Sequence, residues 1–214
     1  TMIENKWLGS KTVQGFYKKV KGDNGKSEIL SLDLDTLEYR SKKRANFATL
    51  ELTKTIDKVI DRFKVLVSGK DKAGEFYRKN FAAMFQYVSN RIPEITNDLY
   101  KIDDAMKAGF GWEHGPFQIW DAIGVEKGIE IMKAEGLKPA EWVNDMLASG
   151  NSSFYTVKNG ATYAYDIPKK SQEKIPGQDA FIILDNIRKS NEVFKNSGVV
   201  IEDLGDGILN CEFQ

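Results

Sequence analysis

The sequence is short of the residues that build disulfides and metal sites. Its 214 residues include one cysteine, Cys211, and one histidine, His114. A lone cysteine cannot form an internal disulfide, and no cysteine–histidine cluster with zinc-ligand spacing exists. We therefore predict a chain from a reducing, cytoplasmic setting that holds no metal.

Charge of one sign and long apolar runs are also missing. Lys plus Arg and Asp plus Glu both number 31, so the formal net charge is zero. No overall field then draws in nucleic acid or an anionic membrane surface. The N-terminus has no basic region followed by an apolar stretch, and no run approaches the roughly 18 apolar residues of a membrane span. We expect neither nucleic acid nor integral membrane contact.

The composition is typical of a globular protein, and the middle of the sequence has a helical periodicity. Apolar side chains on a 3.6-residue period predict helices over 48–68, 71–91 and 94–108. Asp71 is the expected N-cap of the second helix, and Pro93 ends it because proline disfavours a helical residue before it. The expected apolar faces are Leu52, Ile56, Val59, Ile60, Phe63 and Val67; Tyr77, Phe81, Met84, Phe85 and Val88; and Ile95, Leu99, Ile102 and Met106.

Three shorter helices follow, punctuated by proline and glycine. Proline suits the first turn of a helix, and glycine is common just past its end. Short helices are thus predicted at 116–123, 125–136 and 139–150.

Beyond these helices the apolar period changes to the strand value of 2. Residues 153–158 and 161–166 flank Asn159-Gly160, a dipeptide that favours a type I′ turn, and they predict a β-hairpin. The other segments are a short strand or extended stretch at 28–39, an exposed connector at 167–178, a partly helical stretch at 179–196, and a second hairpin from 199–202 and 207–213.

The loop from Gly109 to Gly115 is the first candidate site, since its spaced glycines superficially resemble a dinucleotide-binding turn. Such a turn needs a strand before the glycines and a helix after them. A predicted helix comes first here, so a tight helix-to-helix turn is favoured. We expect the two outer glycines, Gly109 and Gly115, to be needed for close approach or positive φ.

His114 beside Glu113 suggests general acid–base chemistry, because a carboxylate near an imidazole holds its tautomer and raises its pKa. Adjacent residues seldom point at each other, and the spacing places no second titratable partner. A capping or surface histidine is therefore favoured.

Acidic pairs could hold a metal or lie on the surface. Oxygen-ligand loops use several spaced carboxylates. Asp103 and Asp104, on a predicted helix, are therefore better explained as solvated charges, and so are Asp33 and Asp35, which we place on one strand face.

Aromatic and sulfur-containing side chains have simple explanations too. The cluster Trp112, Phe117 and Trp120 is favoured as core or interface packing over ligand binding, since aromatics dominate buried energetics. Cys211 alternates with apolar residues and is predicted to be a small buried hydrophobe.

Residues 104–124 contain a helix end, Gly-x-Gly, Gly-Pro-Phe and then an aspartate, Asp121. This order resembles the hallmark of the helical C-terminal domain of 3-hydroxyacyl-CoA dehydrogenases. The segments Trp7-Leu-Gly9 and Gly15-Phe-Tyr17 are similar to the tail that closes a preceding copy of that domain. Residues 199–213 resemble the opening hairpin of an enoyl-CoA hydratase domain. The combination is similar to long bacterial fatty-acid-oxidation proteins in which a dehydrogenase half precedes a hydratase half.

The resemblance implies a mainly α fold with peripheral β-hairpins. It also implies a parent enzyme that oxidises the 3-hydroxyl of an acyl-CoA, with NAD accepting the hydride. In the family, the catalytic histidine, glutamate, serine and asparagine belong to parts that would precede Thr1. We therefore assign no catalytic, cofactor-binding or metal-binding residue here and expect no cofactor in this chain alone. His114 stands where the family has no catalytic residue.

Under this interpretation the chain is a piece of a larger protein with four parts. They are a tail of a preceding helical copy plus linker at 1–47, the helical dehydrogenase C-terminal-like domain at 48–150, a hairpin and linker at 151–198, and the truncated start of a hydratase-like domain at 199–214. The implied partners are an acyl-CoA substrate through the parent enzyme, neighbouring dehydrogenase and hydratase domains, and further copies of the chain. Two alternatives stay open: a helical interaction module displaying the aromatic cluster, and a small enzyme centred on His114.

Overall fold

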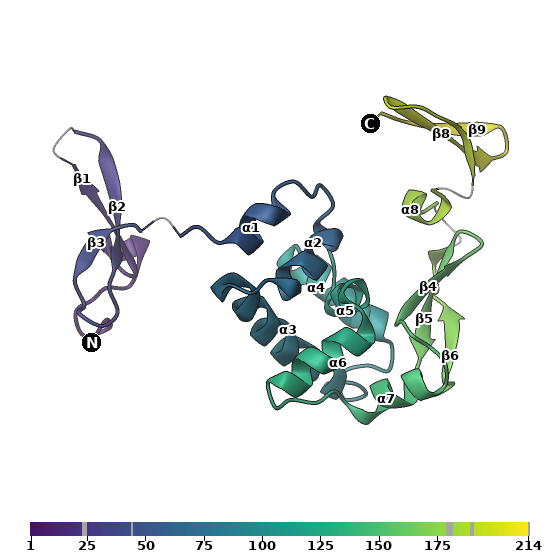
Figure 1. The fold of residues 1–214 in the computed structure, drawn as a ribbon, viewed down its shortest axis with the longest axis horizontal. Helices are drawn as coiled ribbons and strands as arrows, with labels where there is room; N and C mark the ends of the chain where they lie inside the picture. The colour runs from purple at the N-terminus through teal and green to yellow at the C-terminus, as the bar shows by residue number, and fades with distance from the viewer. Residues whose placement is uncertain (23–24, 44, 179–181, 189–190, 214) are drawn as a thin grey trace. The chain divides into compact units, whose positions relative to one another are not determined.

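The computed structural model describes residues 1–22, 25–43, 45–178, 182–188 and 191–213. They divide into two compact units, Thr1–Asn46 and a second that begins at Phe47 (Figure 1). This division lies one residue from the limit expected at residue 47. None of the described helices is long and apolar enough to cross a membrane.

The first unit is a small antiparallel sheet, where the sequence predicted a tail with one short strand or extended stretch. Its strands, in the order β1-β2-β3, are β1 Tyr17–Lys21, β2 Ser27–Leu32 and β3 Tyr39–Ser41, preceded by a 3₁₀ turn at Ser10–Thr12. The ring of Trp7 packs edge-on against Tyr39 at 5.7 Å, and the Tyr39 hydroxyl donates to the Gly15 carbonyl at 2.6 Å. The aromatic opening segment is therefore part of this unit.

Asp33 and Asp35 do not share a strand face, contrary to the prediction. Asp33 follows β2 in a turn, where its carboxylate accepts the backbone N–H groups of Asp35 and Thr36 at 3.1 and 3.3 Å. Arg40 also donates to Asp33 at 2.9 Å. These donors, the Arg40 side chain foremost, lower the pKa of Asp33. A turn-forming role explains this aspartate.

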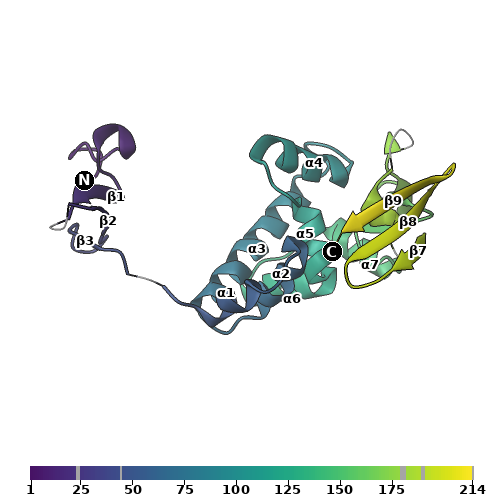
Figure 2. The same cartoon turned by 90° about the horizontal axis from the view of Figure 1, so that it is seen from above.

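The second unit is built around a helical bundle. Its helices are α1 Ala48–Thr53, α2 Val59–Ser68, α3 Lys72–Asn90, α4 Leu99–Phe110, α5 Pro116–Ile123, α6 Val125–Ala134 and α7 Glu141–Ala148. The predictions for α3, α5 and α6 are confirmed within two residues, and α3, α5 and α6 pack together (Figure 2). Asp71 is the N-cap of α3, as expected, and accepts from the Gly74 N–H at 3.0 Å.

Two helix predictions were partly wrong, one in its middle and one at its start. The helix expected over 48–68 is broken between α1 and α2, where the Thr53 hydroxyl donates to the Leu50 carbonyl at 2.8 Å. Such side-chain bonds compete with the helical backbone ladder. The helix expected from residue 94 begins at Leu99, because the Thr96 hydroxyl accepts the Asp98 N–H at 3.1 Å in a turn.

An aromatic stack forms the centre of the core. Phe85 of α3 stacks on Trp120 of α5 at 4.6 Å, and Phe154 packs edge-on against both Phe117 and Trp120 at 5.0 Å. All four side chains have 0% exposure. The core interpretation is thus confirmed for Phe117 and Trp120. It is wrong for Trp112, which is exposed.

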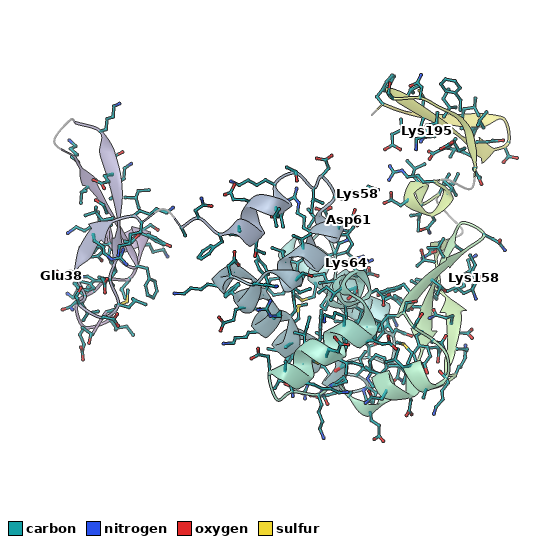
Figure 3. All side chains as sticks on the ribbon, in the orientation of Figure 1. Glu38, Lys58, Asp61, Lys64, Lys158 and Lys195 are labelled. Atoms are coloured by element: carbon teal, nitrogen blue, oxygen red, sulfur yellow. The ribbon has the colours of Figure 1, made fainter. Side chains whose placement is uncertain are left out.

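The predicted hairpins are present, and each gains a third strand. The strands are β4 Tyr155–Lys158, β5 Ala161–Asp166 and β6 Ser171–Lys174, then β7 Glu192–Lys195, β8 Val199–Gly205 and β9 Ile208–Phe213, with a short helix α8 at Leu184–Ile187. Asn159 and Gly160 have φ of 50° and 73°, as a type I′ turn requires, beside Lys158 in Figure 3. The prediction of an exposed connector at 167–178 was wrong, since this segment contains β6. Of the stretch at 179–196, residues 179–181 and 189–190 lie outside the described residues.

Strands are therefore a larger part of the fold than "mainly α with peripheral hairpins" implies, although the segment 48–150 is built on helices. Cys211 on β9 is exposed, so the prediction of a buried hydrophobe was wrong. The buried face of this sheet carries Val200 and Glu202 instead, and Arg188 pairs with Glu212 at 2.7 Å. Cys211 alternates onto the opposite, open face.

Asp71 joins α1 to α3, and its loss should loosen both. Its carboxylate accepts the Thr49 N–H at 2.9 Å and the Thr49 hydroxyl at 2.7 Å, besides the α3 cap. These bonds, the Thr49 N–H foremost, lower the pKa of Asp71 to about 2. The stabilisation is therefore present above pH ~4 and is lost as pH falls towards 2. We expect Asp71→Ala to lower the thermal midpoint at pH 7, with a smaller deficit at pH 2.

Asp61→Ala is the matched control, because this acid lies exposed in the first turn of α2 (Figure 3). Thermal unfolding followed by circular dichroism measures both variants. Equal midpoints for the two variants would contradict the role of Asp71.

Candidate functional site

The Gly109–Gly115 loop joins two helices. Helix α4 ends at Phe110, and Gly111 is its C-cap with φ of 66° and an N–H that donates to the Lys107 carbonyl at 3.0 Å. A Cβ on Gly109 would meet open space, so the prediction that this outer glycine is required was wrong. A Cβ on Gly115 would collide with Asp103, which confirms close approach there. The glycine of this loop that has a positive φ is the middle one, Gly111.

Asp103 is buried, contrary to its interpretation as a solvated charge. The residue is 1% exposed, and its carboxylate accepts the N–H groups of Phe117 and Gln118 at 2.9 and 3.0 Å. These are free N–H groups of the first turn of α5, so a residue of α4 caps the next helix. Asp104 does behave as predicted: it is exposed and pairs with Lys107 at 2.8 Å.

The same carboxylate reaches the β4–β5 hairpin. The Tyr155 hydroxyl donates to Asp103 Oδ2 at 2.8 Å. On α5, Asp121 accepts the backbone N–H groups of Phe154 and Tyr155, both at 2.8 Å. Tyr155 is thus held through its side chain by one aspartate and through its backbone by another. We call Asp103, Asp121 and Tyr155 the Asp–Tyr network.

Burial dominates the electrostatics of this network. Removal from water raises the pKa of Asp103 to about 6, against the hydrogen bonds that favour its charged form. Burial, with a smaller push from the charge of Asp103, raises the pKa of Asp121 to about 7. Burial and the nearby carboxylates also raise the pKa of Tyr155, so its phenol remains a donor at neutral pH.

A groove of about 850 Å³ borders the network, between α4 and α5 on one side and the hairpin and residues 175–178 on the other. His114, Asp121 and Tyr155 line it. His114 Nε2 lies 3.4 Å from Glu113 Oε1, so these neighbours do approach one another, and the ring packs edge-on against Phe63 at 6.5 Å. His114 is neither the α5 cap, which is at Gly115, nor fully exposed, with 24% of its side chain accessible.

The groove offers a histidine–carboxylate pair as titratable chemistry. Within the described parts of the chain, no three His, Cys, Asp or Glu side chains gather as metal ligands. Gln118, another lining residue, uses its Oε1 to accept the Gly115 N–H at 3.0 Å. The polar groups of the loop and of α5 are largely engaged in bonds within the fold.

Residues 72–164 match the family of 3-hydroxyacyl-CoA dehydrogenase C-terminal domains. The resemblance of residues 104–124 to this helical domain is therefore confirmed. The match spans α3 to α7 and most of the β4–β5 hairpin, and it contains the whole Asp–Tyr network. No solved structure matches this chain significantly.

Curated relatives extend the likeness beyond residues 72–164. The chain is 36% identical over 213 residues to a "Probable 3-hydroxyacyl-CoA dehydrogenase" of Bacillus subtilis (strain 168), covering 99% of this chain and 26% of the relative. It is 27% identical over 143 residues to a "Putative fatty acid oxidation complex trifunctional enzyme" of Rickettsia prowazekii (strain Madrid E), covering 67% of this chain and 18% of the relative. The chain thus spans about a quarter, or less, of the length of these relatives.

The dehydrogenase C-terminal hallmark now has a structural explanation. Gly115 leaves room for Asp103, Pro116 starts α5, and Asp121 binds the first residues of the hairpin. Sequence reasoning noticed the glycine, the proline and Asp121 but missed the role of Asp103 and the whole contribution of Tyr155. The signal that could have found Asp103 is its spacing, since it lies four residues after Leu99 on the same face of α4.

The two outer glycines should respond oppositely to alanine. Gly115→Ala forces a Cβ into Asp103 and should destabilise the protein by about 1–3 kcal/mol, the usual range for overpacking. Gly109→Ala enters open space within α4 and should stabilise it by roughly 0.5–1 kcal/mol. Urea unfolding of both variants measures the difference. Similar changes in the free energy of unfolding for the two variants would refute the difference in packing between Gly115 and Gly109.

Removal of the Tyr155 hydroxyl tests the bond to Asp103. Tyr155→Phe leaves the buried carboxylate one donor short, and we expect a loss of about 1–3 kcal/mol in the free energy of unfolding. Tyr87→Phe removes a hydroxyl from an exposed ring and serves as the control, with no measurable change expected. An unchanged free energy of unfolding in Tyr155→Phe would show that the bond does not stabilise the hairpin.

Proposed function

We propose that this chain supplies scaffold helices to an NAD-dependent 3-hydroxyacyl-CoA dehydrogenase of fatty acid β-oxidation. The observation that carries the proposal is the likeness to dehydrogenase relatives across 99% of this chain but only 26% of the relative. A chain of this length corresponds to one part of such an enzyme. Oxidation of the 3-hydroxyl and hydride transfer to NAD are then activities of the larger protein.

The hydrogen bonding of the polar residues supports a structural role. Asp103 and Asp121, the most buried carboxyls of the dehydrogenase-like segment, accept five hydrogen bonds between them, all from groups within the fold. A catalytic acid or base needs a proton position that faces substrate. Carboxyls bonded in this way are better suited to joining the helices to the hairpin than to exchanging a proton with an external substrate.

The larger enzyme provides the proposed partners. NAD binds to parts beyond this chain, and the helices contribute to the acyl-CoA cleft or to an interface with a neighbouring domain or a second copy. The names of the Rickettsia relatives, "fatty acid oxidation complex trifunctional enzyme", support further catalytic domains, among them a hydratase for which residues 199–213 would form the first hairpin. The setting we propose is the cytoplasm.

The two alternative functions differ in how they use the aromatic and histidine residues. An interaction module displaying Trp112, Phe117 and Trp120 loses support, because two of the three are 0% exposed in the core. A small enzyme centred on His114 draws support from the His114–Glu113 approach in the groove. An activity test separates this alternative from the scaffold proposal.

The purified 214-residue chain should produce no NADH from NAD⁺ and a 3-hydroxyacyl-CoA. We expect no change in absorbance at 340 nm (NADH) above the protein-free rate, and no NAD⁺ binding in calorimetry. The Bacillus subtilis relative, assayed in parallel, is the positive control. NADH formation that disappears in a folded His114→Ala variant would overturn the scaffold proposal in favour of the small enzyme.

A further inference from the structure

The sheet of β7, β8 and β9 has one edge strand without the usual protection against further pairing. β9 lies at the edge, and β8 is its one partner among the strands of the described part of the chain (Figure 2). The outer N–H and C=O groups of an edge strand are a template for another strand, unless lysine, proline or a bulge blocks them. Residues 208–213 contain no lysine, arginine or proline, and the pairing of 209–213 with β8 is regular.

The opposite edge of the same sheet, β7, is protected. Its register against β8 shifts between Glu192 and Phe194, which marks a bulge. The same strand carries Lys195, labelled in Figure 3. A bulge bends its strand and disrupts the ladder of backbone hydrogen bonds. A further strand can therefore pair with this sheet more readily at β9 than at β7.

The one charged side chain of β9 is neutralised within the chain. Glu212 accepts hydrogen bonds from two guanidinium nitrogens of Arg188, at 3.1 and 2.7 Å. The other face of the strand carries Leu209, Cys211 and Phe213, all exposed. The formal net charge of the whole chain is zero. A second copy therefore meets a neutral, largely apolar strand and no overall repulsion.

We propose that β9 is a self-association edge, at which the β9 strands of two copies pair antiparallel about a two-fold axis. Their two three-stranded sheets then form one continuous sheet. A two-fold axis uses the same surface on both copies, so the pairing occupies both β9 edges and stops at a dimer. The proposal rests on the geometry of this chain and is independent of the proposed function.

An axis at Cys211 gives the register with the best-matched neighbours. It places Leu209 of one copy opposite Phe213 of the other, which forms an apolar cross-strand pair. It also places Asn210 opposite Glu212, so that no two like charges meet. The two Cys211 side chains then lie opposite each other. An axis at Asn210 would instead leave Phe213 beyond the end of the paired strand.

Sedimentation velocity of the 214-residue chain in reducing buffer tests the pairing. One strand pair buries less than the about 1,200 Å² of a stable interface, so we expect a weak dimer that grows with protein concentration, and no larger species. Cys211→Lys places two lysines opposite each other and should raise the dissociation constant of the dimer by about tenfold or more.

Val193→Lys is the matched control for the lysine substitution. It adds the same charge at a side chain on β7 that is 61% exposed. Because an exposed charge away from the pairing edge is screened by salt, the dissociation constant should stay within about twofold of the wild-type value.

Disulfide formation with the oxidant diamide measures the register. Opposite residues of antiparallel strands have Cα atoms roughly 4.5–5.5 Å apart, within the reach of a disulfide. The wild-type chain, in which Cys211 is the one cysteine, should therefore form a linked dimer. In Leu209→Cys combined with Cys211→Ser, the two cysteines lie roughly 13 Å apart along the strands. Their cross-linking should be slower by about tenfold or more.

Three results would overturn the pairing. They are a wild-type chain that stays monomeric at every concentration, a dimer that Cys211→Lys leaves unchanged, and equal cross-linking rates for cysteines at 209 and 211. The last result would mean that the apolar faces of two sheets pack together in place of their edges. The concentration dependence and the wild-type cross-link need no variant, so they decide the question even if a substitution unfolds the sheet.

Discussion

The buried carboxylate of Asp103 is the constraint on which the second unit depends. It caps α5 from the neighbouring helix, occupies the space that a Cβ at residue 115 would need, and accepts the Tyr155 hydroxyl from the hairpin. A buried charge is tolerated only where donors surround it. Helix, loop and hairpin therefore depend on one another: if any one moves away, the carboxylate loses donors that the fold supplies.

Elements with local signals could be predicted from the sequence. Asp71 starts α3 through a bond to an N–H three residues on, Pro116 starts α5, and Asn159-Gly160 closes the hairpin with positive φ at both positions. In each case the deciding contact lies within a few residues along the chain, and short-range patterns record it. The dehydrogenase hallmark at 104–124 was visible for the same reason, as a chain of caps, turns and close approaches.

The candidate site depended on contacts that no local pattern records. Asp103 and Tyr155 are 52 residues apart, and Asp121 and Phe154 are 33 apart. Asp103 lies four residues after Leu99, and this spacing places it on the buried face of α4 and separates it from the exposed Asp104. The local pattern does not record the distant donor, Tyr155, that binds the carboxyl there. The prediction that Cys211 is buried was wrong, because alternation in a strand does not say which face another element covers.

These long-range bonds also explain how the turn between α4 and α5 is held in place. The polar groups at the start of α5 are already engaged: the Phe117 and Gln118 N–H groups with Asp103, and the Gln118 side chain with the Gly115 N–H. A helix N-terminus binds an external anion when its N–H groups are free. Here the Asp103 carboxylate of the same chain occupies that position and accepts two N–H groups of the first turn of α5.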